Sequence, residues 1–118
     1  MKRGNPEQIF HQSVAQYLAA VLPPEVLWTT IGHGGGGKVR GALLKSMGVL
    51  PGVADVLAFH DGKFFAMELK SAEGKLTEAQ SNFLSAIEAA GGYTAVCKTL
   101  DRALACLEAW QLLKGKAA

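Results

Sequence analysis

The sequence has little cysteine and no long apolar run, and both features limit what the chain can be. Its two cysteines, Cys97 and Cys106, form no CxxC pair, so neither a zinc site nor a disulfide framework is expected. No stretch approaches the roughly 20 apolar residues of a transmembrane helix. Polar residues such as Asn5 and Glu7 stand where a signal peptide would have its apolar core. We therefore expect a cytoplasmic protein that does not contact membranes.

A strong charge of either sign is also lacking. The 118 residues include 12 Lys and Arg against 10 Asp and Glu, which gives a net charge of +2. Such weak basicity permits nucleic acid as a partner but does not by itself indicate one. The length predicts a single domain over residues 1–118 with a hydrophobic core of its own.

Hydrophobic periodicity and turn residues predict eight elements in the order α-β-α-β-β-α-β-α. Helices are expected from Asn5-Pro6 to Pro23, over 39–47, after Thr77 and over about 100–113. Strands are expected over 26–31, twice within 52–70, and over 93–98. The pattern predicts an α/β fold, in which helices cover both faces of a mixed sheet.

The stretch Gly52–Lys70 is expected to form a hairpin that turns at Asp61-Gly62, because both positions tolerate positive φ. Residues whose numbers sum to 123 then face each other, so Asp55 faces Glu68. Lys70 follows on the same side of the strand as Glu68. A bulged turn would shift this register by one residue.

Two opposed carboxylates at the end of an apolar strand are costly unless something offsets their charge, and a divalent cation between them would do so. Oxygen ligands suit Mg²⁺, with Mn²⁺ as a substitute. Lys70 beside them could position an attacking water or stabilise charge in the transition state. The alternative is a surface salt bridge between Glu68 and Lys70, with Asp55 capping a turn.

The segment Gly32–Lys38 (GHGGGGK) nearly matches a phosphate-binding P-loop, but Val39 stands where Ser or Thr would hold Mg²⁺. Nucleotide hydrolysis is therefore not expected. Glycines here would let a phosphodiester backbone approach the main chain, and Lys38 and Arg40 add positive charge. The alternative is a plain linker with solvated basic side chains.

Three stretches together resemble the VRR-NUC family of the PD-(D/E)XK nuclease superfamily. They are Gly48–Asp55 (GVLPGVAD), Glu68–Lys70 (ELK) and Gly74–Gln80 (GKLTEAQ). One departure is that the superfamily's Pro-Asp pair is Ala54-Asp55 here. The resemblance implies a restriction-endonuclease-like fold of the standalone type found in phages and bacteria, and so a bacterial cell or a phage-infected host.

The resemblance also implies metal-dependent hydrolysis of DNA phosphodiesters. Asp55 and Glu68 would bind Mg²⁺, Lys70 would be catalytic, and Glu7 would join as a metal ligand and catalytic residue. Gln80 would join from a second helix. The DNA-binding residues expected are Gly34, Gly35, Lys38, Arg40 and Lys75.

Two of these residues also have structural explanations. Glu7 suits a helix N-terminus electrostatically, and Gln80 completes a capping box that begins at Thr77. The roles do not exclude each other.

The resulting hypothesis is a Mg²⁺-dependent, structure-selective endodeoxyribonuclease that acts on branched or nicked DNA. The resemblance suggests one specific case, in which a homodimer cuts Holliday junctions. The alternatives are a nickase or general DNA endonuclease, and a DNA-binding module without catalytic activity.

Overall fold

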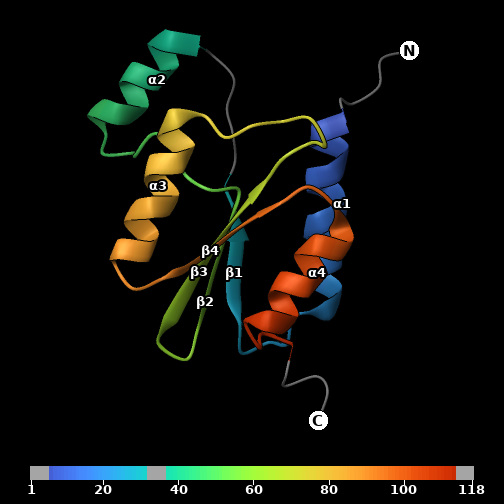
Figure 1. Ribbon diagram of the computed structural model, residues 1–118. Helices are drawn as coiled ribbons and strands as arrows, with labels where there is room; N and C mark the ends of the chain where they lie inside the picture. The colour runs from blue at the N-terminus through green and yellow to red at the C-terminus, as the bar shows by residue number, and fades with distance from the viewer. Residues whose placement is uncertain (1–5, 32–36, 114–118) are drawn as a thin grey trace.

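A computed structural model of the chain describes residues 6–31 and 37–113, with the backbone alone at 37–40. The elements follow the predicted order. They are α1 (Pro6–Val21), β1 (Leu27–Thr30), α2 (Gly37–Ser46), β2 (Val56–His60), β3 (Lys63–Leu69), α3 (Glu78–Ala89), β4 (Tyr93–Cys97) and α4 (Leu100–Ala109). The expected mixed sheet between helices is confirmed (Figure 1).

The sheet has four strands in the order β1-β2-β3-β4. The pairs β1/β2 and β2/β3 are antiparallel, and β4 lies parallel to β3 after the α3 crossover. Asp61 and Gly62 have φ values of 53° and 76°, which makes the turn a two-residue turn without a bulge. Val56 pairs with Met67, so the predicted hairpin register is confirmed.

Helices α1 and α4 cover one face of the sheet, and α3 covers the other (Figure 1). The larger core fills the layer beneath α1 and α4, because both helices and the sheet turn apolar side chains into it. Its buried residues include Val14, Leu18, Phe65, Met67, Ala103 and Leu107. A smaller core of Ala54, Ala66 and Leu84 lies under α3.

The prediction that the last helix extends to Leu113 is wrong, because α4 ends at Ala109. Gln111 adopts a φ of 63°, and the Leu112 N–H donates to Leu107 O at 3.0 Å. A residue in the left-handed conformation followed by this bond, which joins residues five apart, forms a Schellman motif. The motif ends the helix and reverses the chain. It buries Leu112 in the core. None of the described helices is long and apolar enough to cross a membrane.

The two cysteines are free thiols that meet where β4 and α4 pack together. Their Sγ atoms are 3.7 Å apart. Burial, helped by the neighbouring Cys106, raises the pKa of Cys97 to about 12. Cys97 therefore stays protonated and poorly nucleophilic at neutral pH, as expected for a structural thiol.

Candidate active site

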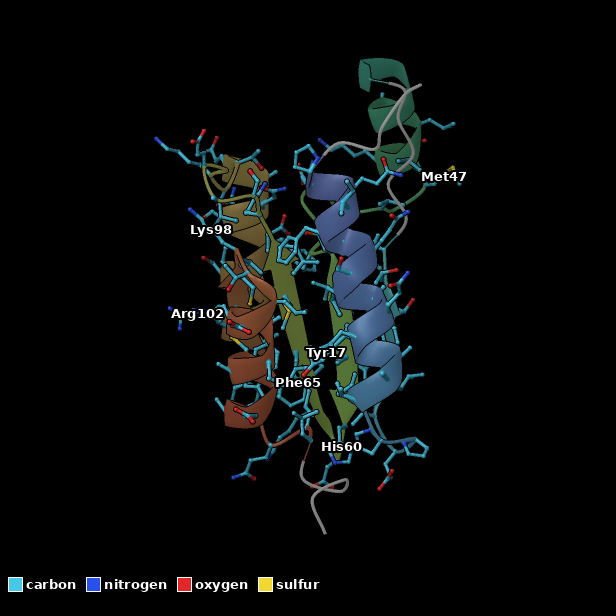
Figure 2. The ribbon with its side chains drawn as sticks, turned by 90° about the vertical axis from the view of Figure 1, so that its right-hand side faces the viewer. Tyr17, Met47, His60, Phe65, Lys98 and Arg102 are labelled. Atoms are coloured by element: carbon cyan, nitrogen blue, oxygen red, sulfur yellow. The ribbon has the colours of Figure 1, made fainter. Side chains whose placement is uncertain are left out.

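The polar residues of the hairpin gather at the end of the sheet opposite the Asp61-Gly62 turn, where β2 begins and β3 ends. The first turn of α1 and the whole of α2 lie at the same end (Figure 1). In Figure 2, Met47 marks this end and His60 marks the other. The carboxylates therefore share this end of the sheet with the start of α1 and with α2.

Asp55 precedes β2 by one residue and is only 4% exposed. Its Oδ2 accepts a hydrogen bond from the Leu69 N–H at 2.7 Å. This bond crosses from β2 to β3, so the carboxylate is held against the strand that carries Glu68.

Glu68 is 2% exposed, and none of the residues described donates a hydrogen bond to its Oε1. Burial raises the pKa of Glu68 to about 7, and the charge of Asp55 and a hydrogen bond with that carboxyl act in the same direction. Lys70 lowers this pKa in part, and Glu7 adds a small increase. Two charged carboxylates are therefore unfavourable here unless a proton or a cation offsets them.

Lys70 supplies the positive charge nearest to Glu68. Its Nζ lies 3.7 Å from Glu68 Oε2, and its side chain is 12% exposed. The Lys70 N–H donates to Cys97 O at 3.0 Å, which fixes the end of β3 against β4. The ammonium therefore has a defined position next to the carboxylate pair.

Helix α1 brings Glu7 to the rim of the site together with His11, which is not among the site residues predicted from the sequence. The His11 Nε2 atom lies 3.6 Å from Asp55 Oδ2 and 3.9 Å from Glu7 Oε2. The Glu7 side chain is 55% exposed, whereas that of His11 is 25% exposed. The i, i+4 spacing of Glu7 and His11 on one helix face was the available signal.

Gln80 has the capping role that its sequence context predicts. Its Oε1 accepts from the Thr77 N–H at 2.9 Å, and its own N–H donates to Thr77 Oγ1 at 3.1 Å. A further role of Gln80 in the site stays a prediction.

The expected DNA-binding residues are described only in part. Lys75 is exposed in the loop between β3 and α3. Gly34 and Gly35 lie outside the described residues, as do the side chains of Lys38 and Arg40.

The oxygen donors at this end of the sheet are carboxylates, which suit Mg²⁺ or Mn²⁺. Within residues 6–31 and 37–113, no three His, Cys, Asp or Glu side chains are already arranged to hold a metal ion. Asp55 and Glu68 therefore offer a two-carboxylate site, with Glu7 at its solvent side. Mg²⁺ commonly binds through one or two carboxylates and completes its shell with water and phosphate oxygens.

The same arrangement of elements occurs in a solved structure described as a VRR_NUC domain protein. The two superpose with a TM-score of 0.69, over 96% of this chain and 92% of that chain, at 18% sequence identity. This chain has a VRR-NUC fold. The structural similarity confirms the expected fold. At this low sequence identity it shows the fold alone. No family profile and no curated protein matches the sequence.

Gly52 allows the loop that leads to Asp55 to pass close to α3. Its φ is +75°, and a Cβ added there would lie 2.3 Å from Ala79 O. The loop that leads to Asp55 thus passes directly against the first turn of α3, and only glycine fits.

Gly52→Ala should lower the free energy of unfolding by about 2 kcal/mol or more, because it adds a backbone clash to an unfavourable φ. Urea unfolding would measure this loss. Gly48→Ala is the matched control, since Gly48 has a φ of +92° but open space around it, and should cost only about 1 kcal/mol. Equal losses in both variants would contradict the close approach.

Proposed function

We propose that this protein is a divalent-metal-dependent endonuclease that hydrolyses phosphodiester bonds in DNA. The observation that carries the proposal is the buried Asp55–Glu68 pair with Lys70 beside it, at the end of the sheet opposite the hairpin turn in a VRR-NUC fold. A divalent cation would offset the repulsion between the two carboxylates, and DNA phosphates would supply the remaining oxygen ligands.

Each residue of the site has a chemical task in this proposal. Asp55 and Glu68 would hold Mg²⁺ or Mn²⁺, with Glu7 as an added ligand or through water. When bound, such a cation supplies charge stabilisation at phosphorus and acidifies a water ligand. Lys70 would orient the attacking water or stabilise the charge that develops on the phosphoryl oxygens. Glu68 must lose its proton to act as a ligand, and its raised pKa makes metal binding favour pH above about 7.

We further propose that the preferred substrate is branched or nicked DNA, with the Holliday junction as the specific case. A homodimer with two-fold symmetry would present two equivalent sites for paired cuts.

A cleavage panel with a solution-mass measurement tests the proposal. The DNAs are a four-way junction, a flap, a nicked duplex, a linear duplex and a single strand, each with Mg²⁺, Mn²⁺ or EDTA. We expect cleavage with either metal and none in EDTA, with the junction cut fastest by a dimer.

Asp55→Asn is the isosteric variant that tests the site. It removes the charge but keeps an oxygen that can accept from the Leu69 N–H, so the fold should persist while the rate falls by about 10³-fold or more. Cleavage in EDTA would refute the metal mechanism. Full activity of Asp55→Asn would refute the site.

A further inference from the structure

Helix α2 stands away from the sheet, above the start of α3, instead of packing into either core layer (Figure 1). Its described side chains over 41–46 are exposed apart from Leu44, which is half-buried. Beyond its end, Met47 is 68% exposed and Leu50 is 62% exposed, and Met47 points outward in Figure 2. Exposed apolar side chains that gather at one place are typical of surfaces that contact other molecules.

The same part of the chain carries charge of one sign only. Between Glu25 and Asp55 there is no acidic residue, while Lys38, Arg40 and Lys45 lie in or next to α2. A two-fold contact through α2 would set this cationic segment against its own copy. An anionic polymer complements it better.

A hollow of about 550 Å³ lies between α2 and the start of α3. We call it the α2 hollow. Its apolar wall is formed by Ile31, Leu44, Val49 and Leu50. Pockets of roughly 300–1,000 Å³ commonly hold small ligands, so the α2 hollow can accept a group of the size of a nucleobase.

The polar lining of the α2 hollow suits the edge and phosphate of a nucleotide. Lys45, Thr77 and Gln80 all contribute to it. The helix cap uses the acceptor atoms Thr77 Oγ1 and Gln80 Oε1. The hydroxyl hydrogen and the side-chain NH₂ group therefore stay available as donors, and nucleobase edges carry matching oxygen and nitrogen acceptors.

The α2 hollow is close to the carboxylate pair along the chain. Val53 belongs to its lining and stands two residues before Asp55, so the two Cα atoms are at most about 7 Å apart. A DNA strand advances about 3.4 Å per nucleotide. A nucleotide in the α2 hollow would thus lie within a few steps of the scissile phosphate.

We propose that the α2 hollow binds one unstacked nucleotide of the DNA, and that Leu50 at its rim contacts the exposed base. In a continuous duplex the apolar faces of the bases are covered by stacking, and they become available where stacking is interrupted. The inference rests on the proposed function, and it assigns the preference for interrupted DNA to α2 and the turn after it.

Binding measured in EDTA tests this without cleavage. The probes are a fluorescein-labelled duplex and the same duplex with one bulged 2-aminopurine. We expect the wild-type protein to bind the bulged DNA about fivefold more tightly or better and to raise 2-aminopurine fluorescence as the base leaves the stack.

Leu50→Ser should reduce the preference to less than about twofold and suppress the fluorescence change, since it removes the apolar contact. Leu27→Ser is the matched control, because Leu27 is 68% exposed but lies on β1 away from the α2 hollow. It should leave both readouts unchanged. Circular dichroism would verify that both variants fold.

Two results would overturn the inference while leaving the proposed function intact. One is DNA binding and cleavage by the wild-type protein with no preference for the bulge. The other is an unchanged preference in Leu50→Ser. Failure to bind or cleave any DNA would refute the proposed function and the α2 hollow together.

Discussion

Glu68→Gln should abolish metal-dependent cleavage and at the same time stabilise the metal-free protein above neutral pH. The side chain is 2% exposed, and its Oε1 receives no hydrogen bond from the described residues. Gln keeps the shape of Glu68, removes its charge and adds an NH₂ group that can donate to Asp55. The loss of a metal ligand should lower the cleavage rate by about 10³-fold or more.

The expected gain in stability depends on pH. The pKa of Glu68 is raised from 4.5 to about 7 in the folded protein, so the folded state holds a proton that the unfolded state has released. The stability of the wild-type protein therefore falls as pH rises from about 4.5 through about 7. The shift corresponds to about 3 kcal/mol at most above pH 7. Glu68→Gln should not show this fall.

Thermal unfolding in EDTA at pH 5 and pH 8 measures the effect. Glu68→Gln should raise the Tm at pH 8 by several degrees and change it little at pH 5. Glu108→Gln is the control, because Glu108 is exposed on α4 and should change neither value. Adding Mn²⁺ should raise the Tm of the wild-type protein but not that of Glu68→Gln. A lower Tm for Glu68→Gln at pH 8 would contradict the opposed-carboxylate site.

The sequence predicts those parts of the site that depend on local rules. The Asp61-Gly62 turn sets the hairpin register by backbone conformation alone, and this brings Asp55 and Glu68 to the same end of the sheet. The capping box at Thr77 and Gln80 is likewise a contact between residues three apart. Both are present in the structure.

Features that depend on packing between distant elements were not predicted. The contact between His11 and Asp55 depends on the angle at which α1 packs on the sheet. Helical periodicity in the sequence does not determine that angle. The chain reversal at Gln111 places a non-glycine residue at positive φ, which backbone sterics disfavour. The burial of Leu112 outweighs that cost. The separation of α2 from the core also has no sequence signal, since its apolar residues follow a helical pattern whether or not a partner covers them.

Lys70→Met should reduce cleavage by about 10²-fold or more while leaving Mn²⁺ binding in place, and this separates catalysis from metal binding. Lys70 Nζ lies 3.7 Å from Glu68 Oε2, and Lys70 lowers the pKa of Glu68. Removing it leaves a buried carboxylate without its cation, which should cost about 2 kcal/mol of stability at pH 8 in EDTA. Mn²⁺ should still raise the Tm of Lys70→Met, because both carboxylates remain.

A double-mutant cycle completes this test. In Glu68→Gln/Lys70→Met the carboxylate and the ammonium are both absent, so the loss caused by Lys70→Met alone should be largely recovered, with a coupling of about 1–2 kcal/mol. Lys63→Met is the control, because Lys63 is exposed at the hairpin turn far from the site. Additive losses in the double variant would show that Lys70 and Glu68 do not interact. Loss of the Mn²⁺-induced Tm increase in Lys70→Met would place Lys70 in metal binding instead of the chemical step.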